Sequence, residues 1–170
     1  KRLDLGIFLD GDCDRVMFID EKGNEIAADI IAALLIDKYK YKKILKDSQS
    51  TKMIDEVCKK NRTKVILTRI GHSFVDTKLK QTSSEFGSER SGHYYYKDFF
   101  FKDNALLTII RLINIIDKPV SKLVGPYKKY FHSGELNFTV EDKKGLIKAL
   151  EKEYKGHKMS YFDGLTITTA

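Results

Sequence analysis

The most constraining feature of the sequence is an acidic hexapeptide between two short apolar runs. Residues 10–15 read Asp-Gly-Asp-Cys-Asp-Arg, preceded by Ile7–Leu9 and followed by Val16–Ile19. This arrangement predicts a strand, a loop and a second strand. Carboxylates at the alternate positions Asp10, Asp12 and Asp14 converge on one ion when the backbone curls around it. Oxygen ligands of this kind suit magnesium or calcium better than zinc or copper.

Two other kinds of acidic loop share part of this pattern. An EF-hand matches Asp10, Asp12, Asp14 and Glu21 at its ligand positions, but its sharp turn requires glycine where Arg15 stands. The flanks are also strand-like rather than helical, so an EF-hand is excluded. A haloacid-dehalogenase-type phosphatase opens with an apolar strand and an Asp-x-Asp pair, but it continues with Gly and then Thr or Val. Here Cys13 and Asp14 follow, so that interpretation is weaker.

The rest of the chain alternates between strand and helix patterns. Apolar residues recur at helical spacing after residue 25, between residues 53 and 61 and from residue 74 to 79, whereas residues 44–45 and 64–68 are strand-like. A polar loop at residues 87–92 precedes an aromatic strand region (94–101) and an apolar helix (105–116). After two prolines we expect a strand at 135–140, a helix at 143–154 and a strand at 165–169. This predicts an α/β fold of βαβ type, with a mixed, mostly parallel sheet flanked by helices, and a partial α+β domain at the C-terminus.

The amino-acid composition limits the classes of molecule that this chain is expected to bind. The net charge is +7, which favours anionic partners, although the lysines are spread along the chain. Tyr94–Tyr96 and Phe99–Phe101 fit a half-buried strand better than a nucleic-acid stacking surface, so we expect no nucleic acid. No apolar run reaches the roughly 20 residues needed to cross a bilayer, and no signal peptide is evident. We therefore expect no membrane partner and a cytoplasmic location. The two cysteines imply neither a disulfide framework nor a zinc site.

Three segments together resemble the α-D-phosphohexomutase superfamily, which includes phosphomannomutase and phosphoglucomutase. Residues 10–15 are similar to its Asp-Gly-Asp-x-Asp-Arg metal loop. Residues 69–74, Arg-Ile-Gly-His-Ser-Phe, are similar to its Thr-Gly-His-Ser turn. Residues 87–93, Gly-Ser-Glu-Arg-Ser-Gly-His, resemble its Gly-Glu-x-Ser-Gly-His sugar loop. The order of elements from residue 135 onward also resembles the start of the last domain of that family.

The resemblance implies a phosphohexomutase, which interconverts hexose 1-phosphate and hexose 6-phosphate through a phosphoserine and a bisphosphorylated sugar. It implies Mg²⁺ as the metal and, in the intact enzyme, an activator of the glucose 1,6-bisphosphate type. The partner would be a phosphorylated hexose, and the assembly a monomer or dimer. The implied roles are metal ligation for Asp10, Asp12 and Asp14, catalysis for Arg15 and His72, and substrate binding for Glu89, Ser91 and His93.

Other roles remain open for some of these residues. His72 also fits a structural hydrogen-bond donor, and Glu89 and Ser91 also fit a turn or capping pair. The sequence departs from the family at Ile70, at Ser88 and at Gln49, where a basic residue is expected, so the general base is unidentified.

The family's phosphoserine loop and final phosphate loop have no counterpart in these 170 residues. We therefore expect a fragment that is inactive alone. It would comprise the end of domain 2 with the metal loop (1–25), the sugar-binding domain 3 (26–118), a linker (119–126) and part of domain 4 (127–170). The alternative is a non-catalytic α/β module that binds a phosphorylated ligand or a protein.

Overall fold

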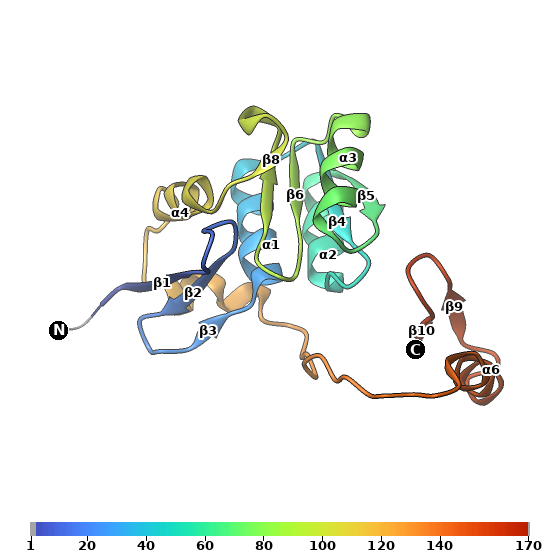
Figure 1. Ribbon diagram of the computed structural model, residues 1–170. Helices are drawn as coiled ribbons and strands as arrows, with labels where there is room; N and C mark the ends of the chain where they lie inside the picture. The colour runs from blue at the N-terminus through green and yellow to red at the C-terminus, as the bar shows by residue number, and fades with distance from the viewer. Residues whose placement is uncertain (1–2, 170) are drawn as a thin grey trace. The chain divides into compact units, whose positions relative to one another are not determined.

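A five-stranded mixed sheet organises most of the chain in the computed structural model, which describes residues 3–169 (Figure 1). The strand order is β5-β4-β6-β7-β8. β4 (Lys43–Asp47) pairs in parallel with β5 (Lys64–Thr68) and with β6 (Phe86–Ser88). β7 (Tyr94–Tyr96) continues the sheet antiparallel to β6, and β8 (Lys102–Asp103) follows antiparallel to β7. The mixed α/β prediction is confirmed, with parallel pairing confined to the β5-β4-β6 half.

Helices cover both faces of this sheet. α1 (Ala28–Tyr39) and α2 (Lys52–Asn61) lie together on one face, and α3 (His72–Thr82) packs against the other. All three end in a residue with left-handed backbone, which stops the helix and satisfies its last carbonyl groups. The sequence predicted all three helices.

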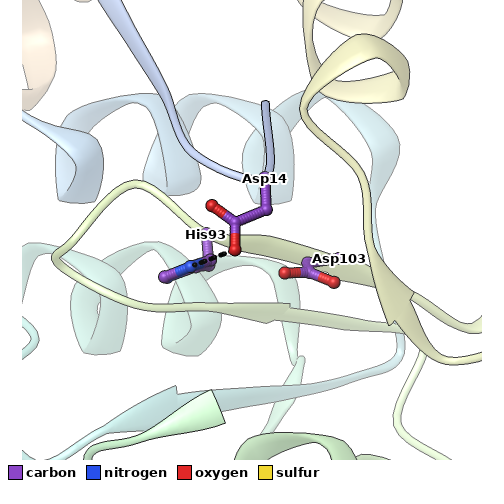
Figure 2. Close-up of side chains that lie close together, drawn as sticks. All are labelled: Asp14, His93 and Asp103. Carbon is purple, nitrogen blue, oxygen red and sulfur yellow. Dashed lines mark ion pairs between the residues drawn. The ribbon is translucent and has the colours of Figure 1, made fainter. Parts of the chain in front are cut away.

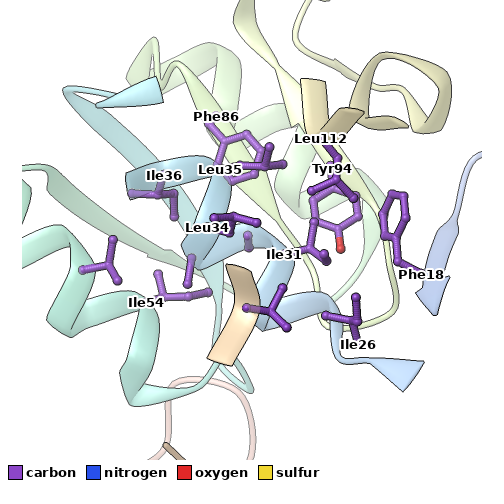
Figure 3. Packing of buried hydrophobic residues seen from close by; sticks show 14 of the residues in the cluster. Phe18, Ile26, Ile31, Leu34, Leu35, Ile36, Ile54, Phe86, Tyr94 and Leu112 are labelled. Atoms are coloured by element: carbon purple, nitrogen blue, oxygen red, sulfur yellow. The ribbon is translucent and has the colours of Figure 1, made fainter. Parts of the chain in front are cut away.

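The main core lies between α1 and the sheet. Six consecutive residues of α1, from Ile31 to Ile36, are fully buried, because this helix is enclosed by the sheet, α2 and further elements of the chain. Figure 3 shows Leu35 beside Phe86 of β6 and Ile31 beside Tyr94 of β7. Burying each aliphatic or aromatic side chain of this size contributes about 1.5–3 kcal/mol. This core therefore holds the strands in place below the candidate site.

A three-stranded antiparallel sheet precedes α1. β1 (Leu5–Leu9), β2 (Val16–Asp20) and β3 (Glu25–Ile26) are paired in sequence order. Val16 and Phe18 on β2 are buried in the main core. The strand-loop-strand prediction around the acidic hexapeptide is confirmed, since Leu9 pairs with Val16 on either side of the loop.

The aromatic region predicted as a strand at residues 94–101 is a strand only at Tyr94–Tyr96, whereas the predicted linker contains a helix. The 3-10 helix η1 (Lys97–Phe99) lies between β7 and β8, and α4 (Ala105–Ile113) follows β8. Within the stretch predicted as a linker, α5 (Val120–Val124) forms a short helix whose apolar side chains enter the main core, and η2 (Gly125–Tyr127) follows it. The assignment of chain segments to family domains stays a prediction.

A second unit begins after Tyr130. It contains α6 (Lys143–Glu153) and the antiparallel pair β9 (Lys158–Ser160) and β10 (Thr166–Thr168), which confirms a helix and a strand predicted there. The strand predicted at 135–140 is wrong. Leu136 and Phe138 alternate as in a strand but are exposed, and a strand needs a hydrogen-bonded neighbour. None of the described residues pairs with this segment. Within residues 3–169, no helix has the length and apolar character required to cross a membrane.

Candidate functional site

Two loops of the site leave the sheet at the same edge. β5 and β6 both run parallel to β4, so their carboxyl ends meet where α/β proteins commonly bind ligands. The turn after β5 leads to Gly71 and His72 at the start of α3, and the loop after β6 spans residues 89–93. Asp47 ends β4 between them. The acidic loop between β1 and β2 approaches this edge from outside the sheet.

The acidic loop curls as its residue types predict. Cys13 adopts a left-handed backbone with φ of 62°, and its N–H donates to the carbonyl of Asp10 at 3.3 Å. One carboxylate oxygen from each of Asp10, Asp12 and Asp14 lies within 4.8 Å of the others. Three carboxylates this close repel one another unless a cation lies between them.

Arg15 folds back on the loop that it ends. Its Nε donates to Oδ2 of Asp10 at 2.5 Å and its backbone N–H donates to Oδ1 at 3.2 Å. Burial raises the pKa of Asp10, but the hydrogen bonds and positive charge of Arg15 outweigh that effect and lower it. Asp10 is therefore held as an anion, as a metal ligand must be. Half of the Arg15 side chain remains exposed.

The donor set fits a hard divalent cation. Oδ1 of Asp14 is shielded from solvent and accepts no hydrogen bond from the described residues, while Nε of Arg15 lies 3.7 Å away. A shielded carboxylate oxygen without a donor is costly, and a bound cation would satisfy it. Oxygen ligands from three carboxylates match the preference of Mg²⁺.

The loop at residues 89–93 is a tight turn that touches the acidic hairpin. Gly92 donates to the carbonyl of Glu89, and Glu89 donates to the carbonyl of His93. Gly92 has φ of 98°, a conformation that favours glycine. Its carbonyl accepts the N–H of Val16 at 3.2 Å. Val16, which follows the acidic loop, is thereby hydrogen-bonded to the loop at residues 89–93.

His93 joins the two loops through its ring. Nε2 lies 3.3 Å from Oδ2 of Asp14, and Nδ1 lies 2.8 Å from Oγ of Ser91 and 3.4 Å from Oε2 of Glu89. Figure 2 shows Asp14 and Asp103 next to this ring. Ligand atoms of Asp14, His93 and Asp103 also lie within 4.8 Å of one another. Asp14 therefore belongs to two overlapping groups of metal-ligand atoms.

His72 completes the cluster from the start of α3. Its Nε2 lies 3.2 Å from Oδ2 of Asp103, and its ring centroid lies 6.0 Å from that of His93. The structure thus brings together the residues that the sequence singled out, which are Asp10, Asp12, Asp14, Arg15, His72, Glu89, Ser91 and His93. Their chemical roles stay predictions.

Glu89 is much less accessible than its place in a polar loop predicted. Its side chain is 4% exposed. Oε1 accepts the N–H of Gly71 at 3.1 Å, and Oε2 accepts the hydroxyl of Tyr95 at 2.5 Å. The carboxylate therefore joins the turn after β5 to the loop after β6.

Sequence reasoning missed three residues of this region. Asp103 and Tyr95 are described above, and Asp47 is the third. The buried Asp47 carboxylate accepts hydrogen bonds from the N–H of Gln49, the hydroxyl of Ser50 and the N–H of Arg90. An acid at the end of a parallel strand was the available signal for Asp47, whereas nothing in the sequence distinguished Tyr95 from its two tyrosine neighbours.

Comparison with known proteins agrees with this arrangement. Residues 22–130 match the family model for phosphoglucomutase/phosphomannomutase, alpha/beta/alpha domain III. Phosphomannomutase of Methanocaldococcus jannaschii is 32% identical over 171 residues, which cover 96% of this chain and 38% of that protein.

Two solved structures show the same fold. A phosphoglucomutase/phosphomannomutase family protein from Burkholderia thailandensis superposes with a TM-score of 0.83 at 26% identity, covering 96% of this chain and 37% of that one. The N-acetylphosphoglucosamine mutase of Aspergillus fumigatus, in complex with GlcNAc-6P and magnesium, gives 0.55 at 14% identity. That match covers 94% of this chain and 46% of the Aspergillus chain. The chain thus spans less than half the length of each of these relatives.

Proposed function

The chain belongs to the phosphoglucomutase/phosphomannomutase family, and on that premise we propose that it forms the metal-binding and sugar-binding part of a phosphohexomutase. Such an enzyme moves a phosphoryl group between the 1- and 6-positions of a hexose. Because the chain spans 38% of the Methanocaldococcus phosphomannomutase, we assign the complete reaction to a full-length enzyme. We expect the 170-residue chain alone to leave glucose 1-phosphate unconverted, with or without a glucose 1,6-bisphosphate activator.

The contact between Asp14 and His93 carries this proposal. It connects the carboxylates suited to a metal with the loop that holds Glu89 and Ser91. Phosphoryl transfer depends mainly on positioning and on neutralising charge. A site that places carboxylates for a cation beside acceptors for sugar hydroxyls meets both needs.

Asp10, Asp12 and Asp14 would hold the metal, and Mg²⁺ is the ion that their oxygen atoms favour. A bound Mg²⁺ supplies positive charge next to a phosphoryl group. The magnesium in the Aspergillus complex supports this choice of metal, and its GlcNAc-6P supports a phosphorylated sugar as the ligand.

The remaining residues would orient the sugar phosphate. Arg15 lies beside the carboxylate of Asp10 with half its side chain exposed, and its guanidinium would bind a phosphate. The rings of His72 and His93 lie 6.0 Å apart, and both would flank the bound sugar phosphate. Glu89 and Ser91 would accept hydrogen bonds from sugar hydroxyl groups.

A metal titration tests the proposal. Asp12 is exposed, so Asp12→Asn removes a ligand with little change in folding. We expect Mn²⁺, used as a spectroscopic substitute for Mg²⁺, to bind this variant at least about tenfold more weakly than wild type. Asp117→Asn removes the same charge from an exposed position outside the site and serves as the matched control. If both variants bind Mn²⁺ like wild type, the acidic loop is not the metal site.

A further inference from the structure

Tyr95 is buried directly beneath the candidate site. It is 0% exposed, and its side chain lies with Leu45, Val75 and Leu79 on the face of the sheet that α3 covers. Tyr94 and Tyr96 belong to the core on the opposite face, as alternation along a strand requires. Only the middle tyrosine of β7 therefore faces the loops of the site.

The Tyr95 hydroxyl is one of two donors that fix the carboxylate of Glu89. It donates to Oε2 at 2.5 Å, and the N–H of Gly71 donates to Oε1 at 3.1 Å. One donor would let the carboxylate rotate about its last torsion. Two donors from different elements, one on each oxygen, fix both its plane and its direction.

These contacts also limit what Glu89 can bind. A carboxylate has about four acceptor positions. Two of them are used by Gly71 and Tyr95, and Nδ1 of His93 lies 3.4 Å from Oε2 as well. Burial, followed by the hydrogen bond to Glu89, raises the pKa of Tyr95, so this hydroxyl remains protonated and donates throughout the physiological pH range. The remaining acceptor positions of Glu89 suit donors on the ligand, and sugar hydroxyl groups are donors of that kind.

We propose that Tyr95 is a positioning residue that sets the orientation of Glu89 for binding hexose hydroxyl groups. The proposal rests on the proposed function where it assigns sugar binding to Glu89. Its structural part, that Tyr95 fixes the Glu89 carboxylate against Gly71, stands independently of any ligand.

The two neighbouring tyrosines provide matched controls. The hydroxyl of Tyr94 donates to the carbonyl of Ala28 at 3.2 Å, and the hydroxyl of Tyr96 is paired with Oγ1 of Thr108 at 2.8 Å. Both residues are 0% exposed. Tyr→Phe at positions 94, 95 or 96 therefore removes one hydrogen-bonding hydroxyl from a buried ring of the same strand, and only position 95 involves Glu89.

The first measurement is amide hydrogen exchange at Gly71 by NMR in the 170-residue chain. Tyr95→Phe leaves Glu89 with one fewer donor, so its bond to Gly71 loosens. We expect exchange at Gly71 to accelerate by about tenfold, the effect of weakening one hydrogen bond to a charged group. Tyr94→Phe and Tyr96→Phe should leave Gly71 at the wild-type rate.

The second measurement is an NMR titration of the same proteins with glucose 6-phosphate in the presence of Mg²⁺. We expect Tyr95→Phe to weaken binding by about tenfold and the two controls to change it less than twofold. Unchanged exchange at Gly71 in Tyr95→Phe, or equal acceleration in all three variants, would overturn the positioning role. Accelerated exchange without any sugar binding by wild type would instead keep Tyr95 as the residue that fixes Glu89 and reject sugar binding by this chain.

Discussion

Gly92 is the position where a single added methyl group should disturb the contact between the acidic loop and the loop at residues 89–93. It has φ of 98°, and a Cβ added there would lie 3.0 Å from the carbonyl oxygen of Val16. A contact of this length is tighter than nine in ten real Cβ contacts, so Gly92→Ala must shift either the 89–93 loop or the strand that follows the acidic loop by a few tenths of an ångström. The hydrogen bond from Val16 N–H to the Gly92 carbonyl would be strained in either case.

The magnitude follows from two contributions. Placing a non-glycine residue in a left-handed backbone conformation costs about 1–2 kcal/mol. Losing or weakening the Val16 hydrogen bond adds about 0.5–1.5 kcal/mol. We therefore expect Gly92→Ala to lower the free energy of unfolding by about 1.5–3.5 kcal/mol.

Gly23→Ala is the matched control. Gly23 also has a positive φ, at 84°, but a Cβ there would meet nothing within 4 Å. Only the backbone contribution of about 1–2 kcal/mol applies to it. Urea denaturation of wild type and both variants measures the difference, and Mn²⁺ titration should show weaker binding only in Gly92→Ala. Equal destabilisation of the two variants, together with equal Mn²⁺ affinity, would refute the idea that this close contact joins the loops.

Three further predictions concern buried or reactive groups. Burial raises the pKa of Asp29 from its ordinary value of 3.8 to about 6, with the negative charge of Asp47 adding to the shift and Arg90 and Lys46 opposing it. The folded state therefore binds more protons between these pH values. Wild type therefore loses stability as the pH rises through about 6, because Asp29 must then carry a buried charge, whereas Asp29→Asn does not. In urea unfolding, the stability of Asp29→Asn should rise relative to wild type by about 2 kcal/mol between pH 4 and pH 7.5, and a difference independent of pH would contradict this. Asp47→Ala removes the acceptor for three hydrogen bonds and should lower the free energy of unfolding by about 2–4 kcal/mol. Ser50→Ala removes only one of these bonds and should lower it by about 1 kcal/mol. Similar losses of stability in the two variants would argue against a role for Asp47 in holding the loops. Cys13 is exposed, whereas burial raises the pKa of Cys58 to about 12. A thiol reagent should therefore label one cysteine in the native chain and two in urea. Rapid labelling of Cys58 in the native chain would contradict its burial.

Local hydrophobic periodicity was sufficient to predict helices and strands with a clear apolar pattern of their own. Residues 64–68 combine β-branched and apolar side chains and form β5 at those bounds. Met53, Ile54, Val57 and Cys58 form the buried face of α2. Pattern was not sufficient at residues 135–140, where apolar residues alternate but no described strand pairs with them. A strand is completed by its neighbour, and pairing is not encoded in the segment alone.

The short strand β6 shows the opposite error. Residues 87–92 were predicted to be a polar loop, yet Phe86–Ser88 forms the centre of the sheet between β4 and β7. Gly87 fits because a Cβ there would lie 3.0 Å from Leu79 of α3, so the helix packs closely over it. A glycine and a serine within a strand carry little local signal, because their position depends on packing.

The identity of the site residues was accessible from sequence, whereas their arrangement had two different origins. Gly71–His72 and Glu89–His93 follow strands parallel to β4, so the topology of the sheet alone brings them to one edge. The acidic loop belongs to another sheet, and no rule of parallel strands places it there. Its position depends on the burial of Val16 and Phe18 in the main core and on the bond from Val16 to Gly92. The bond from Val16 to Gly92 joins residues 76 positions apart, and together with the burial of β2 it explains why a cluster of carboxylates lies beside His93 rather than in solvent.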